Sequence, residues 1–261
     1  MPRAWNIGRR AAGLSSALIL LSVSLLPAPQ AAESTGLKVG AGAEYLNRTI
    51  SWDEQAYTSS LRGYLFSLQA DYEVRPGLSV LFRGGYALSS FNGLVFRELP
   101  FSVEYQAGFT GGLYLGGGFK AHAPAAEVFY LEFEALFDTC FGFGGQWALE
   151  GLAVPGALEG RSSWSRISVG PSVWYKGLAY YVYPFVQVRY TSLWGSFTMT
   201  ETVDVLEGTE IKSVKGSGAV AVSIGVLSEV TEVLSLRAEA TAVPRSGGLD
   251  LGASVRLAFS F

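Results

Sequence analysis

The stretch Leu249–Phe261 reads LDLGASVRLAFSF. Every odd position in it is apolar, and every even position is small or polar. Because successive side chains of a β-strand point to opposite faces, the pattern predicts a strand with one wholly apolar face. In a soluble sandwich that face would pack on a core. In a membrane barrel it would meet lipid, and the other face would line the lumen.

The same two-residue alternation recurs along the chain. The segments are about as long as the 9–11 residues that a tilted membrane strand needs, and they number about ten, an even count as in single-chain bacterial barrels. Eight strands is the nearest alternative, reached if the weakly alternating region 101–120 or the strand at 220–226 is misread. The segments are 37–45, 64–72, 78–86, 109–120, 129–138, 166–175, 181–190, 220–226, 234–240 and 249–261.

Short and long connections alternate between these segments, as in barrels with short periplasmic turns and longer outer loops. We expect short turns at 74–77, 122–126, 177–178 and 228–232. Polar outer loops are predicted at 47–60, 90–100, 144–163 and 198–215. Tyrosine and tryptophan residues lie near the segment ends, where interfacial aromatic girdles are found. Together these features predict an all-β fold, a closed antiparallel up-and-down transmembrane barrel.

Composition supports an envelope protein. Charged residues make up 16% of the chain, against about 25% in a typical soluble domain, and hydrophobic residues reach 49%. The formal net charge of −3 argues against a nucleic-acid partner, which would require a basic surface. After the N-terminal region, no stretch approaches the roughly 18 uninterrupted apolar residues of a transmembrane helix.

The N-terminus resembles a secretory signal. Arg3, Arg9 and Arg10 precede the uncharged apolar run Ala11–Leu26, and small residues follow at 27–32. We therefore predict a signal peptide at 1–31, with cleavage near Ala31 or Ala32, and a barrel domain at 32–261. An uncleaved anchor helix is less favoured because the apolar run is short. The paired arginines also suggest a twin-arginine signal, but that route carries folded cargo, whereas a barrel crosses the inner membrane unfolded.

With its signal, alternating strands and terminal aromatic, the chain resembles the small outer-membrane barrels of the OmpA-transmembrane, OmpW and opacity-type group. The resemblance covers the whole mature chain and is one of architecture. It implies an outer-membrane location, with membrane lipid, periplasmic chaperones and the barrel-assembly machinery as partners. It also implies that Phe259 and Phe261 form the signal that this machinery reads. No family-specific motif accompanies it.

The strand phase predicts which charged side chains line the lumen. In a barrel of about ten strands the bore is narrow, and unpaired buried charges are costly, so we expect these charges to pair and plug the interior. The alternative is a narrow ion path with an acidic patch at Glu132, Glu134 and Asp138. The predicted charge network comprises Arg83, Glu132, Glu134, Asp138, Arg166, Arg189, Arg237, Glu239, Asp250 and Arg256.

Two prolines interrupt the strand pattern. If Gly177-Leu178 is a two-residue turn, Pro171 and Pro184 lie opposite each other on the lipid face. A proline cannot donate to the strand ladder, so this pair indicates either a local bulge or a lateral seam through which a hydrophobic ligand could leave the lumen.

No catalytic, metal or cofactor motif is apparent, so we expect no enzyme activity and no cofactor. His122 is the only histidine and is predicted in a periplasmic turn, and Cys140 is predicted to point inward on a strand. Two functions then remain open. The first is a plugged barrel with an envelope-structural or surface-interaction role, whose outer loops meet host or extracellular molecules. The second is a narrow porin-like or hydrophobic-ligand channel for small solutes.

Overall fold

The computed structural model describes residues 36–261 apart from 53–56, 107, 150–155 and 179–180. The predicted signal peptide at 1–31 lies outside these residues. All the regular secondary structure of these described residues consists of β-strands. No helix among the described residues is long and apolar enough to cross a membrane.

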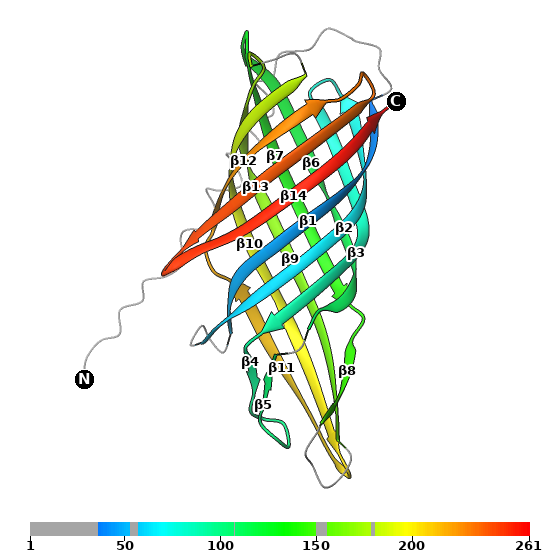
Figure 1. The fold of residues 1–261 in the computed structure, drawn as a ribbon, viewed down its shortest axis with the longest axis vertical. Helices are drawn as coiled ribbons and strands as arrows, with labels where there is room; N and C mark the ends of the chain where they lie inside the picture. Colours follow the sequence, from blue (N-terminus) through cyan, green and yellow to red (C-terminus); the bar gives the residue numbers. More distant parts are fainter. Residues whose placement is uncertain (1–35, 53–56, 107, 150–155, 179–180) are drawn as a thin grey trace, which may run out of the picture. The chain divides into compact units, whose positions relative to one another are not determined.

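Ten antiparallel strands close into one barrel (Figure 1). The main sheet has twelve strands. Ten of them form the ring, β8 (Gly145–Leu149) pairs only with β9, and β11 (Leu206–Gly216) pairs with β10 and, near the head end, with β1. The last ring strand pairs with the first, with Lys38 opposite Ser260 and Leu46 opposite Gly252. The predicted closed up-and-down barrel is therefore confirmed, with ten strands rather than eight. The ring strands are β1 (Leu37–Trp52), β2 (Tyr57–Arg75), β3 (Leu78–Asn92), β6 (Thr110–Ala126), β7 (Phe129–Gly142), β9 (Gly156–Tyr175), β10 (Val182–Val203), β12 (Val220–Glu229), β13 (Leu234–Arg245) and β14 (Gly248–Ser260).

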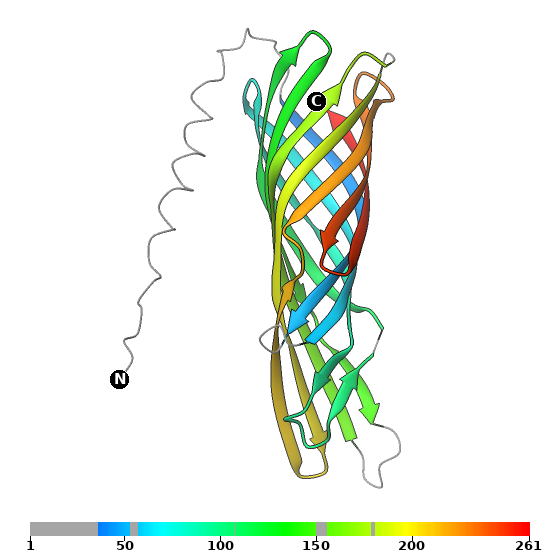
Figure 2. The same ribbon diagram turned by 90° about the vertical axis from the view of Figure 1, so that its left-hand side faces the viewer.

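The barrel has two unlike ends, which we call the turn end and the head end. At the turn end the strands are joined by short links such as 76–77 and 127–128. The first and last strands of the ring also meet there, because the Phe261 amide donates to the Leu37 carbonyl at 3.0 Å. At the head end, additional strands stand between several ring strands, as Figures 1 and 2 show.

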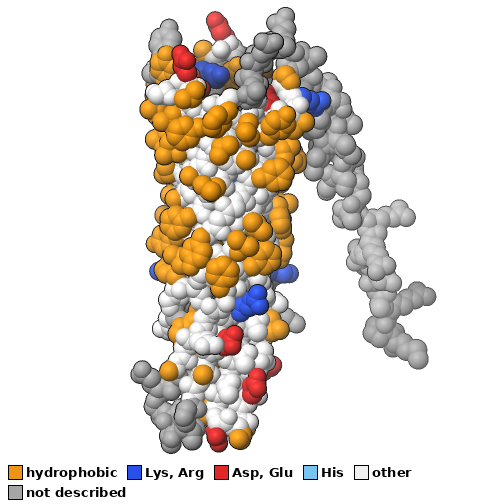
Figure 3. Space-filling model, turned by 90° about the vertical axis from the view of Figure 1, so that its right-hand side faces the viewer, with side chains coloured by type: hydrophobic (Ala, Val, Ile, Leu, Met, Phe, Trp, Pro, Cys, Tyr) orange, Lys and Arg blue, Asp and Glu red, His pale blue; other side chains and the backbone are white. Residues whose placement is uncertain are grey.

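The outer wall of the barrel carries a broad apolar belt (Figure 3). Leu68, Phe82 and Ile224 belong to it and are 70%, 64% and 62% exposed. The odd positions from Leu249 to Phe261 are exposed and the described even ones are mostly turned inward, as the alternation predicted. A closed sheet with such a belt leaves no unpaired edge in lipid and matches the architecture of outer-membrane barrels. The fold is that of a transmembrane β-barrel.

Toward the head end the strands keep their phase, but their polarity inverts. On β10, the outward residues up to Trp194 are apolar except for Ser192, and they are hydroxyl-bearing from Ser196 onward. The inward residues change the other way, from Gln187 to Phe197 and Met199. β1 inverts in the same manner just beyond Tyr45. Because a wall in water needs a polar outside and an apolar inside, the inversion marks where the strands leave the belt.

Beyond the belt the strands form a β-structured head. It contains the hairpin of β4 (Leu94–Phe96) and β5 (Val103–Tyr105), the hairpin of β8 and β9, and the hairpin of β10 and β11. The expectation of polar outer loops at 47–60, 90–100, 144–163 and 198–215 was therefore wrong for most of their described residues, and 53–56 and 150–155 lie outside these. Alternation continues through these segments with inverted polarity, and that inversion conceals strands from a search for lipid-facing apolar residues.

Candidate functional site

The predicted charge network lies inside the barrel, and the structure divides it into three clusters. Arg83, Asp138 and Arg166 form the middle cluster. Glu132, Glu134, Arg189, Arg237 and Glu239 form a cluster nearer the turn end, and Asp250 belongs to a third near the head end. Arg256 makes no ion pair with any described residue.

The middle cluster is centred on Asp138, whose side chain is 1% exposed. Arg83 Nε donates to Asp138 Oδ1 at 2.7 Å, and Arg166 Nη2 donates to Asp138 Oδ2 at 2.8 Å. The Tyr114 hydroxyl donates to Asp138 Oδ1 at 2.9 Å. Arg166 also pairs with Glu44 on the opposite wall. Two cations and two anions therefore span the bore from β1 to β7 and β9.

The turn-end cluster combines charge with aromatic rings. Arg237 Nη2 donates to Glu239 Oε2 at 3.1 Å, and its Nη1 lies 3.5 Å from Glu132 Oε1. Its guanidinium carbon lies 5.0 Å and 4.4 Å from the ring centroids of Trp174 and Phe185, which stack on each other. Trp174 and Phe185 were not among the predicted site residues, although both occupy inward positions of their strands.

Asp250 holds the third cluster together beneath the head. Its carboxylate accepts from the Thr49 amide at 2.7 Å and from Arg245 Nε at 2.9 Å, and Arg48 Nε lies 3.7 Å away. Arg48 in turn donates to the carbonyl oxygens of Ser217 and Gly218. The cluster therefore joins the first residues of β14 to β1 and to the link between β11 and β12.

Two spaces lie in the described part of the lumen. A cavity of about 430 Å³ opens at the turn end and is lined by Trp174, Arg237 and Arg256. A second void of about 50 Å³ lies among the charges of the middle cluster and is also lined by Arg256. The Arg256 side chain thus stands between the two spaces.

A hydrophobic core fills the lumen on its head side and continues into the head. Leu61 and Leu65 are 0% and 2% exposed, so their side chains are buried inside the barrel at this level. The sequence prediction missed this core because it assigned the inward face to polar side chains only. Its members are Leu46, Ile50, Trp52, Leu61, Leu65, Ala87, Phe91, Leu94, Phe96, Leu99, Tyr105, Tyr114, Cys140, Leu158, Trp164, Leu193, Phe197, Met199 and Val214.

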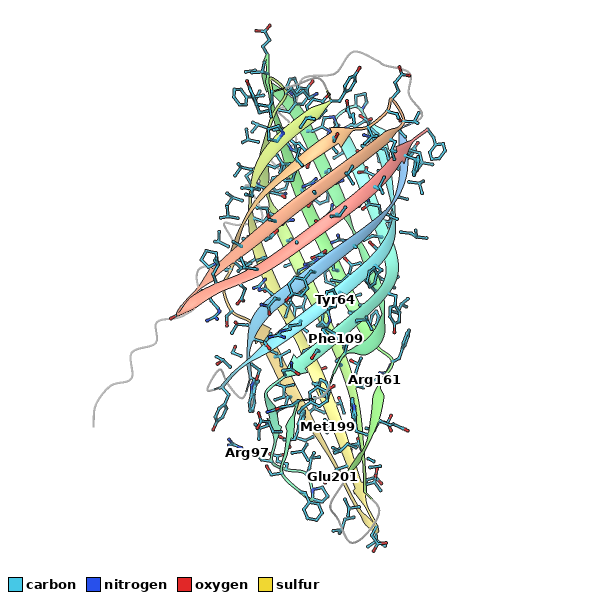
Figure 4. All side chains as sticks on the ribbon, in the orientation of Figure 1. Tyr64, Arg97, Phe109, Arg161, Met199 and Glu201 are labelled. Carbon is cyan, nitrogen blue, oxygen red and sulfur yellow. The ribbon has the colours of Figure 1, made fainter. Side chains whose placement is uncertain are left out.

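Two buried carboxylates fasten the link between β4 and β5 to the extended strands. The Phe101 amide donates to Glu201 Oε2 at 2.8 Å, and the Glu98 amide donates to Glu210 Oε2 at 2.8 Å. Figure 4 labels Glu201 and Met199 on the part of β10 that lies in the head. The head is therefore held by polar contacts as well as by its core.

The geometric basis of the lateral-seam hypothesis was wrong. Pro171 and Pro184 do not face each other, because β9 ends at Tyr175 and β10 begins only at Val182, so the predicted two-residue turn is a longer link. In the resulting register Phe185 lies opposite Trp174, and Pro184 lies opposite Val226 on β12. The β9–β10 ladder lacks paired positions around Pro171 but resumes in the same register.

The remaining predicted residues lie as follows. His122 is part of β6, opposite Glu132, and lines the turn-end cavity, so its assignment to a turn was wrong. Cys140 is buried and points inward as predicted, 3.9 Å from the Ser89 hydroxyl. Phe259 and Phe261 are exposed at the turn end. Among the described residues, no three His, Cys, Asp or Glu side chains are grouped as metal ligands.

Tyr105 in the head gives a pH-dependent prediction. Its hydroxyl is buried without a hydrogen-bond partner among the described residues, and burial raises its pKa to about 12. We expect Tyr105→Phe to leave the free energy of unfolding at pH 7 unchanged or higher by about 1 kcal/mol, because an unsatisfied polar group is removed. Above pH 10 the unfolded tyrosine ionises before the folded one, so this residue costs the wild type stability as pH rises.

Urea unfolding of both proteins at pH 7 and pH 11 checks this expectation. The advantage of the Phe variant should be larger at pH 11 than at pH 7. A variant that is clearly less stable than the wild type at both pH values would show that the hydroxyl has a partner.

Comparison with known proteins gives likenesses of fold. No protein-family model matches the chain. No curated protein matches it either. The translocator domain of the autotransporter NalP from Neisseria meningitidis is 13% identical, with 94% of each chain covered and a TM-score of 0.47. The outer membrane protease OmpT from Escherichia coli is 10% identical, with 89% of this chain and 99% of that chain covered and a TM-score of 0.48.

A further likeness is to the attachment invasion locus protein Ail of Yersinia pestis, which is 10% identical with a TM-score of 0.31 and covers 88% of this chain and 99% of its own. These identities are all low, and the activities of these proteins are not transferred to this chain. The barrel, its belt and its filled lumen are features of this chain's own structure.

Proposed function

We propose that this protein is a non-conducting outer-membrane barrel that displays its head on the cell surface, in an envelope-structural or surface-interaction role. The observation that carries the proposal is the filled lumen, with a hydrophobic core on its head side and ion pairs in its middle. A passage for solutes would require both fillings to move. The long extended strands instead supply a rigid platform for contact with host or extracellular molecules.

The orientation follows from the two unlike ends. Outer-membrane barrels carry short turns on the periplasmic side and longer connections outside. This rule puts the turn end, with Phe259 and Phe261, in the periplasm and the head outside. The terminal aromatics are then available to the barrel-assembly machinery. That the barrel has the architecture of the OmpA-transmembrane, OmpW and opacity-type group is also part of this proposal.

We also propose that the protein is not an enzyme. His122 lies at the turn end, where a general base would face neither surface peptide nor outer-leaflet lipid. Cys140 is buried in the hydrophobic core, and burial raises the energy of a thiolate there, so the thiol is unsuited to nucleophilic attack.

A narrow channel is the second candidate, and the turn-end cavity of about 430 Å³ favours it. Arg256 separates that cavity from the void at the centre of the barrel. If the hydrophobic core opened, solute could enter past these charges, including Glu132 at the side of the cavity.

Planar-bilayer recording separates the two functions. We expect the purified protein to insert without steady single-channel openings, because the core excludes water from the head side of the lumen. Its heat-dependent shift in gel migration serves as the control for folding. Steady openings that respond to Glu132→Gln would support the channel instead, and a protein soluble in water without detergent would contradict both functions.

A further inference from the structure

Near the head end, one strand takes the place of three in the barrel wall. Along β10, the pairing with β12 ends at Tyr190, opposite Val220, and the pairing with β11 begins at Trp194, opposite Lys215. β14 leaves β1 after Leu46, and β11 then pairs with β1 through Ile50↔Gly216 and Ser51↔Lys215. The ends of β12, β13 and β14 therefore form a step in the outer wall, which we call the ledge.

A concave basin lies on this ledge. Its lining comes from β1 and β2, from the end of β11 and the link that follows it, and from the turn between β13 and β14. The open space measures about 1110 Å³, which suits a headgroup larger than a single ion. Two cations, Lys215 and Arg245, and several hydroxyl groups line it, and none of its described lining residues is acidic.

Among the described residues, basic side chains outnumber acidic ones at the ledge. Arg245 is 27% exposed in its side chain and pairs with the buried Asp250, which Arg48 also approaches. Arg48, Arg245 and Lys215 therefore stand against Asp250 as the single carboxylate among the described residues of the ledge. Within the described residues no carboxylate pairs with Lys215. The hydroxyl groups of Thr58 and Ser246 also line the basin and add donors to it.

The basin begins where the apolar belt ends. Leu249 and Leu251 on β14 are 52% and 55% exposed on the outer wall beside the ledge. On the face of the barrel that Figure 3 draws, which is not the face of the β13–β14 turn, basic side chains also appear along the edge of the belt nearest the head. A group held on the ledge would therefore lie at the depth of lipid headgroups, with its acyl chains free to pack on the belt.

We propose that the ledge binds the phosphate-bearing headgroup of an outer-leaflet glycolipid. Lys215 supplies a compact charge, Arg245 supplies guanidinium donors, and the hydroxyl groups match a sugar. Free phosphate shares the charged part of this chemistry but not the sugar or the acyl chains. The inference rests on the proposed orientation of the head toward the outside.

Native mass spectrometry of the purified protein in a neutral detergent tests the proposal, with diphosphoryl lipid A as the probe. We expect one tightly held lipid A per barrel, and roughly fivefold weaker binding for Lys215→Gln, since one basic residue near an anionic surface contributes about 1 kcal/mol. Lys215→Arg should retain binding. Lys176→Gln, which removes an exposed lysine at the turn end, should bind like the wild type.

Two further arms identify the source of the phosphate. Lipid A stripped of its phosphates should bind weakly, and millimolar inorganic phosphate should not displace intact lipid A. Complete displacement by inorganic phosphate would overturn the lipid assignment, and equal binding by Lys215→Gln and Lys176→Gln would overturn the site. The conductance recording does not depend on lipid A. A protein that shows no channel openings and also binds no lipid A would therefore refute the lipid-binding inference but leave the proposed function intact.

Discussion

Replacing Asp138 by leucine is expected to lower the free energy of unfolding by about 3–5 kcal/mol. Asp138 accepts hydrogen bonds from Arg83, Arg166 and Tyr114, and its side chain is almost wholly buried. Without it, two guanidinium groups remain in the middle of the bore with Glu44 as the only nearby anion of the cluster. Urea unfolding in detergent micelles or lipid vesicles measures the loss.

A second variant separates lost attraction from stranded charge. In Arg83→Met with Asp138→Leu, one cation leaves together with the anion, so Arg166 and Glu44 remain as a balanced pair. We expect this double variant to be more stable than Asp138→Leu alone, because much of the cost of breaking a buried ion pair comes from the partner left uncompensated.

Asp71 offers a matched control. It pairs with Lys120 at 2.9 Å near the turn end, but the two side chains are 16% and 18% exposed. Water and salt screen such a pair, so Asp71→Leu should cost about 1 kcal/mol or less. Equal losses for Asp71→Leu and Asp138→Leu would contradict a structural role for the middle cluster.

The barrel and the phase of its strands were predictable from the sequence because two solvents act on the two faces of each strand. Lipid demands apolar outward residues such as Phe82, while the narrow bore admits small and charged residues such as Arg83. This contrast repeats every second residue, so counting back from Phe261 gives the phase of the last strand, and the alternation within each other strand gives its own phase.

The head and the ion-pair partners were not predictable in the same way. Beyond Trp194, water replaces lipid outside, so the apolar positions move to the inner face and the segment resembles an irregular polar loop. The register error at Pro171 and Pro184 has another origin. Turn length sets which residues face each other across a hairpin, and the sequence at 176–181 does not contain a standard two-residue turn signal.

A search for an inversion of polarity at constant phase would have found the head. In β1 the inward residues change from Glu44 to Leu46 and Ile50, with Arg48 as the exception, while the outward ones change from Tyr45 to Thr49. The same change occurs in β10. Its position also estimates where the strand leaves the membrane, which a count of apolar residues alone does not show.

Phe197→Ala is expected to have the second large effect, this time on the head. Phe197 is 1% exposed, and its ring centroid lies 5.6, 5.8 and 4.6 Å from those of Phe91, Phe96 and Tyr105. Truncating a buried phenylalanine costs about 3–5 kcal/mol when the cavity cannot collapse. Because Phe197 joins β10 to β3, β4 and β5, the loss should loosen the β4–β5 hairpin from the extended strands.

Protease added to intact cells measures this loosening and the exposure of the head together. We expect Phe197→Ala to be cut within 97–106 while the wild type resists, and the remaining barrel to keep its heat-dependent shift in gel migration. Phe137→Ala is the matched control, because Phe137 lies on the lipid face and is 46% exposed. If both variants resist protease equally, Phe197 does not hold the hairpin. If cutting occurs only after the outer membrane is permeabilised, the head faces the periplasm, and the polarity inversion would then mark the inner boundary of the belt.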